Sequence, residues 1–334
     1  MDIANRQLTG TGAIMGIGQA LLEATTRYDS RVQLVIKESH MIVITAPTGL
    51  IGRQVLGNML GSGEPIRVIV RDPSRLPSEV RERVAVVQGS HGDIDVVDLA
   101  FAGADAVFWL VPPDPHADSA EVAYVDFTRP ACDAFKRYGV QRVVGISALG
   151  RGTAAAGHAG LVAASLAMDD LIASSGVSYR ALTMPSFMDN LLRQVPAIKD
   201  RGVIVAPISG DRKLPTCATR DIAAAAARLL LDESWSGNGH VAVLGPEDLS
   251  FNDMARIMSE VLGQPVRYQQ IPAQALKDRL TGAGMSDAMA QATVDMMTAK
   301  DRGLDNAEPR TAESSTPTSF RQWCEEVLKP AVLA

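Results

Sequence analysis

The feature that most constrains the fold is an alternation, from Met41 onward, of short Val/Ile-rich runs with longer segments of helical periodicity. This alternation is typical of a parallel sheet whose connections are helices lying on both of its faces. We predict strands near residues 41–45, 66–71, 84–88, 105–111, 141–147 and 178–183. We predict helices near residues 50–61, 95–102, 118–138 and 160–175. The pattern therefore indicates an α/β protein with a doubly wound parallel sheet.

Residues 42–52 combine a strand, a turn and a helix start, in the order that places a pyrophosphate at a helix N-terminus. Gly49 allows backbone to approach phosphate, and Gly52 allows the helix to pack on the strand. Ala46 occupies the first glycine position and Pro47 lacks an N–H, so the fingerprint is imperfect and a plain structural turn is the alternative. We predict a Rossmann-type dinucleotide site with six cofactor-binding residues here: Ala46, Thr48, Gly49, Leu50, Ile51 and Gly52.

Two arginines decide which dinucleotide is expected. An acidic residue about 20 positions after the loop would accept the ribose 2′-hydroxyl of NAD(H), whereas arginine binds a 2′-phosphate. The second predicted strand ends at Arg71, and Arg75 follows it. Each guanidinium can pair with a phosphate through a planar fork. We therefore predict NADP(H) as the cofactor, and the alternative is that both arginines are solvated surface residues.

Composition excludes several classes of partner. The 334-residue chain has a formal net charge of −6 and no clustered run of Lys and Arg, so no direct nucleic-acid partner is expected. No apolar stretch approaches the roughly 20 residues that span a bilayer, and no export signal is recognised, so we expect a cytoplasmic protein without membrane contact. Cys132, Cys217 and Cys324 show no metal-ligand spacing, which predicts reduced thiols and no metal site.

The chain divides by pattern into three parts. Residues 1–40 precede the first predicted strand and are interpreted as an N-terminal appendage. Residues 41–190 form the nucleotide-binding domain, and residues 191–334 form a smaller, mostly helical substrate region packed on it. Within the appendage, residues 6–23 resemble a glycine-rich segment of the large subunit of molybdenum hydroxylases. No β-rich run precedes those glycines, so we interpret the segment as a gene-junction remnant or an extra packing helix.

Several motifs beyond the loop share an order and spacing with one family. They are Leu110-Val111-Pro112-Pro113, the run 139–147, Ser175-Gly176-Val177, Pro185-Ser186-Phe187-Met188-Asp189-Asn190, Arg220-Asp221-Ile222-Ala223, Gly245-Pro246-Glu247 and the run 316–320. From Met41 onward the chain resembles the NmrA-like family, atypical short-chain dehydrogenases/reductases that include quinone reductases, azoreductases and redox-sensing regulators. The resemblance implies further cofactor contacts at Val111, Pro112, Pro185 and Phe187. The chain departs from its relatives at Gly89-Ser90-His91, where they carry an acidic residue, and we interpret His91 as a surface or loop residue.

The catalytic pair of typical short-chain dehydrogenases, a Tyr with a Lys four positions later, is absent from the sequence. Hydride transfer remains feasible for acceptors that stabilise negative charge themselves, for which orientation over the nicotinamide is the main demand. Ser147 ends a predicted strand at the carboxyl edge of the sheet, where ligands bind in such folds. Ser147 is therefore the candidate catalytic residue and nicotinamide contact, and a Ser that only closes a strand is the alternative. Asp170, in the following helix, is interpreted as a helix-face charge.

The first functional hypothesis is an NADPH-dependent reductase of quinone-like, azo or other conjugated small-molecule acceptors. The second is an NADP(H)-binding redox sensor without turnover, and a non-binding relative is the third. A homodimer or a regulatory protein partner is left open.

Overall fold

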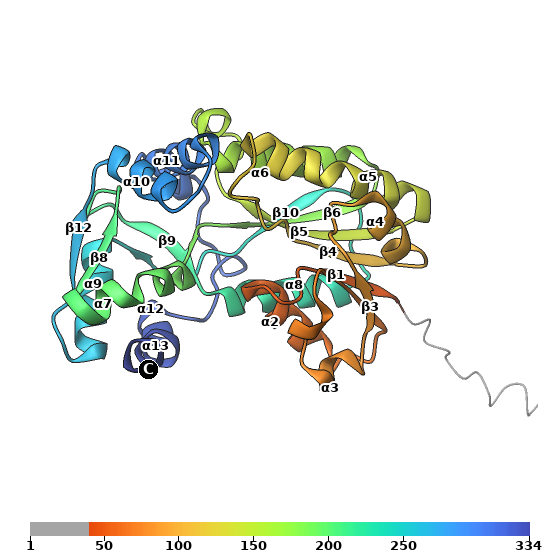
Figure 1. The fold of residues 1–334 in the computed structure, drawn as a ribbon, viewed down its shortest axis with the longest axis horizontal. Coiled ribbons are helices and arrows are strands. Elements are labelled where there is room, and N and C mark those ends of the chain that lie inside the picture. Colours follow the sequence, from red (N-terminus) through yellow and green to blue (C-terminus); the bar gives the residue numbers. More distant parts are fainter. Residues whose placement is uncertain (1–39) are drawn as a thin grey trace, which may run out of the picture. The chain divides into compact units, whose positions relative to one another are not determined.

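The computed structural model describes residues 40–334, and the predictions for the N-terminal appendage lie outside the described residues. Its central element is a seven-stranded sheet, shown in Figure 1, in the order β10-β6-β5-β4-β1-β2-β3. All neighbouring strands of this sheet are parallel. The strands are β1 (Ile42–Thr45), β2 (Ile66–Val70), β3 (Ala85–Gln88), β4 (Ala106–Trp109), β5 (Arg142–Ala148), β6 (Ser178–Met184) and β10 (Gly239–Ala242).

Helices cover both faces of this sheet, which confirms the doubly wound α/β prediction (Figure 1). One face carries α2 (Leu50–Met59) and α8 (Thr219–Leu231). The other carries α4 (Ile94–Phe101), α5 (Phe127–Tyr138) and α6 (Leu161–Ser174). The predicted strands and helices lie within a few residues of those observed.

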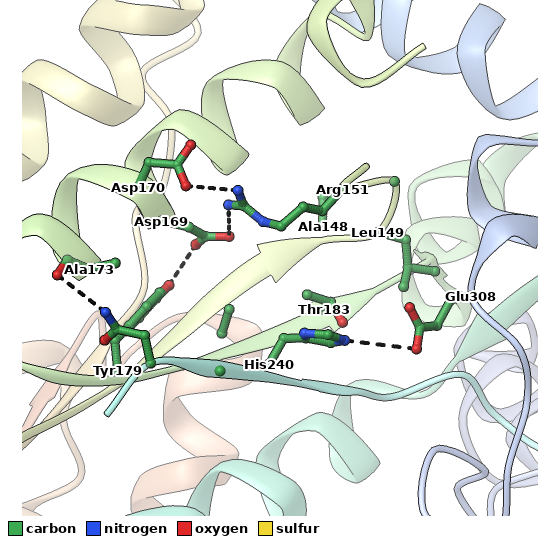
Figure 2. Close-up of a pocket in the computed structure, with 14 residues that line it drawn as sticks. Ala148, Leu149, Arg151, Asp169, Asp170, Ala173, Tyr179, Thr183, His240 and Glu308 are labelled. Atoms are coloured by element: carbon green, nitrogen blue, oxygen red, sulfur yellow. Dashed lines mark hydrogen bonds and ion pairs between the residues drawn. The ribbon is translucent and has the colours of Figure 1, made fainter. Parts of the chain in front are cut away.

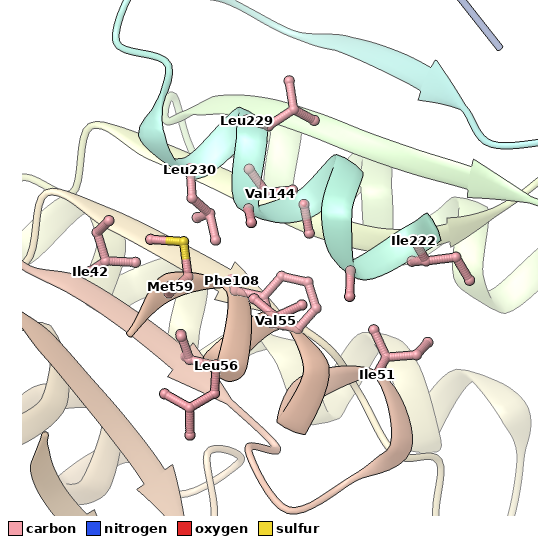
Figure 3. Close-up of a cluster of buried hydrophobic side chains, with 14 of the residues drawn as sticks. Ile42, Ile51, Val55, Leu56, Met59, Phe108, Val144, Ile222, Leu229 and Leu230 are labelled. Carbon is pink, nitrogen blue, oxygen red and sulfur yellow. The ribbon is translucent and has the colours of Figure 1, made fainter. Parts of the chain in front are cut away.

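The central strands β1 and β4 are apolar and buried on both faces, whereas the edge strand β3 is mostly exposed. Ile42 and Ile44 of β1 pack in the cluster under α2 and α8, while Val43 between them packs in the cluster on the opposite face. Figure 3 shows the first cluster, to which both α2, through side chains such as Val55, and α8, through side chains such as Leu230, contribute. Packing in the first cluster fixes the position of α2, and hence of the loop that precedes it.

The rest of the chain forms smaller units. The short strands β8 (Val203–Ala206) and β12 (Arg267–Gln270) pair, as do β7 (Ser186–Phe187), β9 (Leu214–Cys217) and β11 (Asp248–Leu249). The accompanying helices are α7 (Val195–Arg201), α9 (Phe251–Leu262), α10 (Ala273–Gly282), α11 (Asp287–Asp301), α12 (Phe320–Trp323) and α13 (Lys329–Leu333). A short helix α3 (Ser78–Arg81) follows β2. Residues after 190 also supply α8 and β10 to the main sheet and its cover, and the division at residue 190 stays a prediction. Within residues 40–334, no helix is both long and apolar enough to cross a membrane.

Candidate functional site

The turn between β1 and α2 leaves the start of α2 open to a ligand. Ala46 has φ 49°, a left-handed conformation that glycine adopts more easily, and its carbonyl accepts a hydrogen bond from Gly49 N at 3.0 Å. The first turn of α2 carries neither an acidic residue nor a side-chain cap. The N–H groups of Leu50, Ile51 and Gly52 therefore have no intrahelical acceptor, which suits an anion at this end of the helix.

Gly52 fixes how closely the turn approaches α2. A Cβ at this position would lie 2.1 Å from the Ala46 carbonyl oxygen and 3.2 Å from that of Thr45. No side chain fits in this space, because real contacts to a Cβ are ordinarily 3.4 Å or longer. The Ala46 carbonyl takes the position that a side chain at residue 52 would need. The sequence argument that this glycine permits close helix–strand packing is therefore confirmed.

The turn forms one wall of a groove of about 310 Å³, called here the arginine groove. It is lined by Ala46, Pro47, Thr48, Gly49, Ile69, Val70, Arg71, Asp72, Arg75, Gly89, His91 and Pro112. Within residues 40–334, the guanidinium groups of Arg71 and Arg75 have no hydrogen-bond or ion-pair partner. The intervening Asp72 instead accepts hydrogen bonds from the Ser74 N–H at 3.0 Å and the Ser74 hydroxyl at 2.7 Å. Two unpaired positive charges thus face the groove.

His91 lies in a loop, as expected, but it is buried rather than exposed. Its Nε2 lies 2.9 Å from the Leu110 carbonyl oxygen, and its ring makes edge contacts with Trp109 and Phe127. Burial lowers the pKa of this imidazole to about 4, so the ring is neutral near pH 7. At the position where relatives carry an acidic residue, the groove therefore has an uncharged aromatic wall.

A second hollow of about 340 Å³, the Ser147 cavity, lies beside the arginine groove at the carboxyl ends of β4, β5 and β6. It is lined by Ile51, Leu110, Val111, Pro113, Tyr124, Ile146, Ser147, Ala148, Leu161, Val162, Ser165, Met184, Pro185, Ser186, Phe187, Asn190, Arg193, Met296 and Lys300. Most of these side chains are apolar. The charged residues among the described lining are Arg193 and Lys300, and no Asp or Glu is among them.

The structure distributes the predicted cofactor residues over these two hollows. Six line the arginine groove: Ala46, Thr48, Gly49, Arg71, Arg75 and Pro112. Five line the Ser147 cavity: Ile51, Val111, Ser147, Pro185 and Phe187. The remaining two line neither, because Leu50 is exposed at the start of α2 and Gly52 is buried against Ala46. Residues 111 and 112 are adjacent, so the groove and the cavity meet after β4.

Ser147 links the end of β5 to α6. Its hydroxyl donates a hydrogen bond of 2.5 Å to Asp169 on α6. Asp169 is buried and also accepts a hydrogen bond of 2.6 Å from the Tyr179 hydroxyl. Burial raises the pKa of Asp169 to about 6, against the lowering effect of these hydrogen bonds and of Arg151. The sequence analysis named the neighbouring Asp170 and missed Asp169.

Asp169 also lines a third hollow of about 350 Å³, the Asp169 cavity, shown in Figure 2. Its lining is Ala148, Leu149, Gly150, Arg151, Asp169, Asp170, Ala173, Tyr179, Ala181, Thr183, Asn238, Gly239, His240 and Glu308. Arg151 lies 3.5 Å from Asp169 and 2.7 Å from Asp170, which is exposed as its interpretation as a helix-face charge implied. Asp169 therefore lies between two hollows, since its Ser147 partner belongs to the neighbouring one.

Lys300 is a further functional candidate that the sequence analysis missed. It lies on α11, is buried, and lines the Ser147 cavity. Its Nζ is 2.5 Å from the carboxylate of Asp305, which is also buried. Tyr124 lines the same cavity without a lysine at the spacing of a catalytic pair, and burial raises the pKa of its phenol to about 12. Tyr124 is therefore a poor proton donor.

The parallel sheet, the glycine-bearing turn and the ligand-sized hollows at its carboxyl edge define a dinucleotide-binding protein of the Rossmann type. More specifically, the chain belongs to the NmrA-like family, whose family model matches residues 38–324. This confirms the resemblance noted from the sequence motifs.

Three proteins that are similar to this chain have names that describe reductases or oxidoreductases. The chain is 31% identical to a (4-alkanoyl-5-oxo-2,5-dihydrofuran-3-yl)methyl phosphate reductase of Streptomyces griseus, over 86% of this chain and 97% of the relative. It is 27% identical to an NAD(P)H azoreductase of Xenophilus azovorans, over 75% of this chain and 84% of the relative. Among solved structures, an NADPH-dependent quinone oxidoreductase of Escherichia coli complexed with NADPH has a TM-score of 0.71 at 22% identity, over 86% of this chain and 100% of the other.

Proposed function

We propose that this chain is an NADPH-dependent reductase of quinone-like, azo or other conjugated acceptors. One observation carries the proposal: an anion-binding turn with two unpaired guanidinium groups lies beside a mostly apolar cavity at the carboxyl edge of one parallel sheet. The relatives support it, because their names describe reductases of a furanone, an azo compound and a quinone. All three acceptor types are conjugated.

The described residues fit NADPH along its length. The free N–H groups at the start of α2 suit the pyrophosphate. Arg71 and Arg75 would hold the 2′-phosphate, because each presents a planar donor fork and, within residues 40–334, neither guanidinium is hydrogen-bonded or ion-paired to a carboxylate. At the other end, Ser147, Pro185 and Phe187 would border the nicotinamide. In this assignment the arginine groove holds the 2′-phosphate end of NADPH, and the Ser147 cavity holds its nicotinamide end.

NADPH supplies a hydride when it is bound. The residues of the protein orient a flat acceptor, exclude water, and stabilise the negative charge that develops on the acceptor. Apolar side chains such as Ile146, Met184 and Phe187 provide the flat, dry walls. Ser147 and Lys300 bring a hydroxyl and an ammonium to the same cavity, where they stabilise a developing oxyanion. Conjugated acceptors suit this site because delocalisation removes the need for the missing Tyr-Lys pair.

The test is steady-state NADPH oxidation with a panel of quinones, an azo dye and an acyl-substituted unsaturated lactone. NADPH consumption that requires an acceptor supports the reductase. Tight NADPH binding without oxidation by any acceptor would contradict turnover and indicate the redox sensor. Absence of NADPH binding would overturn the cofactor assignment itself. The homodimer, the regulatory partner and the cytoplasmic location stay predictions.

A further inference from the structure

A buried carboxyl group separates the Ser147 cavity from the Asp169 cavity. One carboxylate oxygen of Asp169 accepts the Ser147 hydrogen bond at 2.5 Å, and the other accepts from Tyr179 at 2.6 Å. Ser147 lines the first cavity, whereas Asp169 and Tyr179 line the second. Figure 2 shows Asp169 between Tyr179 and Arg151 on the side of the second cavity. A single carboxyl group thus links a hydroxyl at the proposed acceptor site to a separate hollow.

We propose that Asp169 and Ser147 form a proton relay that protonates the acceptor during its reduction, with the Asp169 cavity as the source of the proton. This inference rests on the proposed function and assigns the proton donor that the missing Tyr-Lys pair leaves open. Ser147 is the catalytic residue, because it lines the cavity proposed for the acceptor. Asp169 acts through Ser147 and is a positioning residue.

The proposed step reduces an acceptor in which a C=C bond is conjugated with a carbonyl group. Two electrons and one hydrogen arrive as hydride at the β-carbon, and the π electrons shift to the carbonyl oxygen. That oxygen takes the proton of the Ser147 hydroxyl, and Ser147 Oγ takes the proton of the Asp169 carboxylic acid in the same event. Asp169 is left as a carboxylate and regains a proton from water in the Asp169 cavity. NADPH is oxidised to NADP⁺, and the acceptor gains two hydrogens.

The Ser147 hydroxyl can pass a proton from Asp169 to the acceptor. A serine hydroxyl donates and accepts at the same time, whereas a carboxylate only accepts. Ser147 Oγ and Asp169 Oδ2 lie 2.5 Å apart, and Ser147 donates this hydrogen bond when Asp169 is ionised. When Asp169 is protonated, it donates to Ser147 Oγ, and the serine proton is free to turn toward the acceptor. The direction of this hydrogen bond therefore depends on whether Asp169 carries a proton that it can transfer.

The environment of Asp169 favours a carboxyl group that gains and loses a proton near neutrality. Burial raises its pKa to about 6, while Ser147, Tyr179 and Arg151 stabilise the carboxylate. Asp170 lies on the same helix and engages Arg151 at 2.7 Å, which divides that positive charge between two carboxylates. These groups contact Asp169 or its Arg151 partner from β5, β6, the loop after β5 and α6. The Asp169 cavity is also lined by Thr183 of β6, His240 of β10 and Glu308.

Packing beneath the relay places Tyr179 under Asp169. A Cβ at residue 145 of β5 would lie 2.3 Å from the Tyr179 hydroxyl oxygen, so only glycine leaves room for the phenol to reach the carboxylate. Among the other described residues of the Ser147 cavity, the Tyr124 phenol has its pKa raised to about 12, and Lys300 is engaged by Asp305. Ser147 is the hydroxyl there with a hydrogen bond to an ionisable carboxyl group.

The experiment compares the wild-type protein with Asp169→Asn, and uses Asp170→Asn as the matched control on the exposed face of the same helix. Two acceptor classes are reduced in single-turnover reactions, with NADPH absorbance as the readout. An unsaturated ketone or quinone takes up a hydride and a proton. A cationic triarylmethane dye takes up a hydride alone, because its central carbon is already electron-deficient. NADPH affinity, measured by fluorescence, checks that each variant is folded.

For the ketone or quinone, the wild-type rate should fall as pH rises through about 6, since the relay needs the protonated carboxyl group that is present below this value. Asp169→Asn should lose this pH dependence and at least about 100-fold in rate, the scale of general acid catalysis. Ser147→Ala should show the same two losses. Asp170→Asn should keep the wild-type rate at low pH and a pH-dependent profile, displaced toward lower pH because Arg151 then pairs with Asp169 alone. Reduction of the cationic dye should change little in any of the three variants.

Two results would overturn the relay: an Asp169→Asn protein with the wild-type rate and pH profile, or one that loses both acceptor classes equally although it binds NADPH. If the wild-type protein does not reduce the cationic dye, the solvent deuterium isotope effect on ketone reduction decides instead. It should exceed unity in the wild-type protein and fall toward unity in Asp169→Asn, and an unchanged effect would overturn the relay. If the wild-type protein oxidises NADPH with none of the acceptors tested, the proposed function itself is refuted and not only the relay.

Discussion

The contact at Gly52 predicts that one added methyl group will damage the nucleotide-binding turn. In Gly52→Ala, a Cβ would lie 2.1 Å from the Ala46 carbonyl oxygen, so α2 and the turn must separate by roughly 1.3 Å to restore an ordinary contact. Overpacking of this kind typically costs about 1–3 kcal/mol of unfolding free energy. Because the same shift moves the N–H groups at the start of α2, NADPH affinity should fall at least about tenfold, which equals one hydrogen bond of about 1.4 kcal/mol.

Gly57 provides the matched control within α2. A Cβ at this position meets nothing within 4 Å, and Gly57 is exposed. Gly57→Ala should therefore stabilise the protein by about 0.5–1 kcal/mol, the usual gain for alanine over glycine inside a helix. Urea denaturation of the wild-type protein and both variants gives the stabilities, and NADPH fluorescence titration gives the affinities. A Gly52→Ala protein as stable as Gly57→Ala, with wild-type NADPH affinity, would refute the reasoning.

Three further predictions concern charged and titratable side chains. Arg71→Ala and Arg75→Ala should each weaken NADPH binding by about 1.5–3 kcal/mol and leave NADH binding unchanged, and equal losses for both cofactors would contradict the 2′-phosphate assignment. Lys300→Met or Asp305→Asn should each cost about 3–5 kcal/mol in urea denaturation, because each leaves the other member of a buried ion pair uncompensated; a cost below 1 kcal/mol would show that the pair is solvated. The pKa of His91 is lowered to about 4 from an ordinary 6.5, so the unfolded chain binds more protons between these values and stability should fall as pH drops from 6.5 toward 4. His91→Gln should lose less stability than the wild-type protein between pH 7 and pH 5, and equal losses would refute this origin.

The sheet and the turn could be predicted because their signals are local. Val/Ile-rich runs gave strands such as β1 and β5 within one or two residues. The capping box of Ser250 and Asp253 at the start of α9 is an equally local signal. The requirement for glycine at residue 52 also follows from the order of strand, turn and helix alone. None of these depends on contacts between distant parts of the chain.

The chemistry of the site depends on distant contacts, and the sequence analysis missed much of it. Asp169 reaches Ser147 across 22 residues, and its burial depends on the strands packed beneath α6. A signal was present, because Val162, Ser165 and Ile172 share its helical face and are all buried. That spacing distinguishes Asp169 from the exposed Asp170.

Lys300 was missed for a similar reason. It continues the stripe of Met289 and Met296 on α11, but only the folded chain shows that this stripe borders the Ser147 cavity. The pairing with Asp305 would have been the clue, since a lysine on an apolar stripe needs a nearby carboxylate. His91 follows Gly89 and Ser90, and this pair predicted a loop correctly. Nothing in the local sequence indicated the contacts of His91 with Trp109 and Phe127.

The central claim is that this chain transfers hydride from NADPH to a conjugated acceptor. The most direct measurement is a single turnover with NADPH that carries deuterium at the transferred C4 position, followed by mass spectrometry of the reduced acceptor. An unsaturated ketone or lactone places the transferred atom on carbon, where it does not exchange with water. We predict one deuterium at the β-carbon of the product. Oxidation of NADPH without deuterium in the product, or no product, would contradict the account.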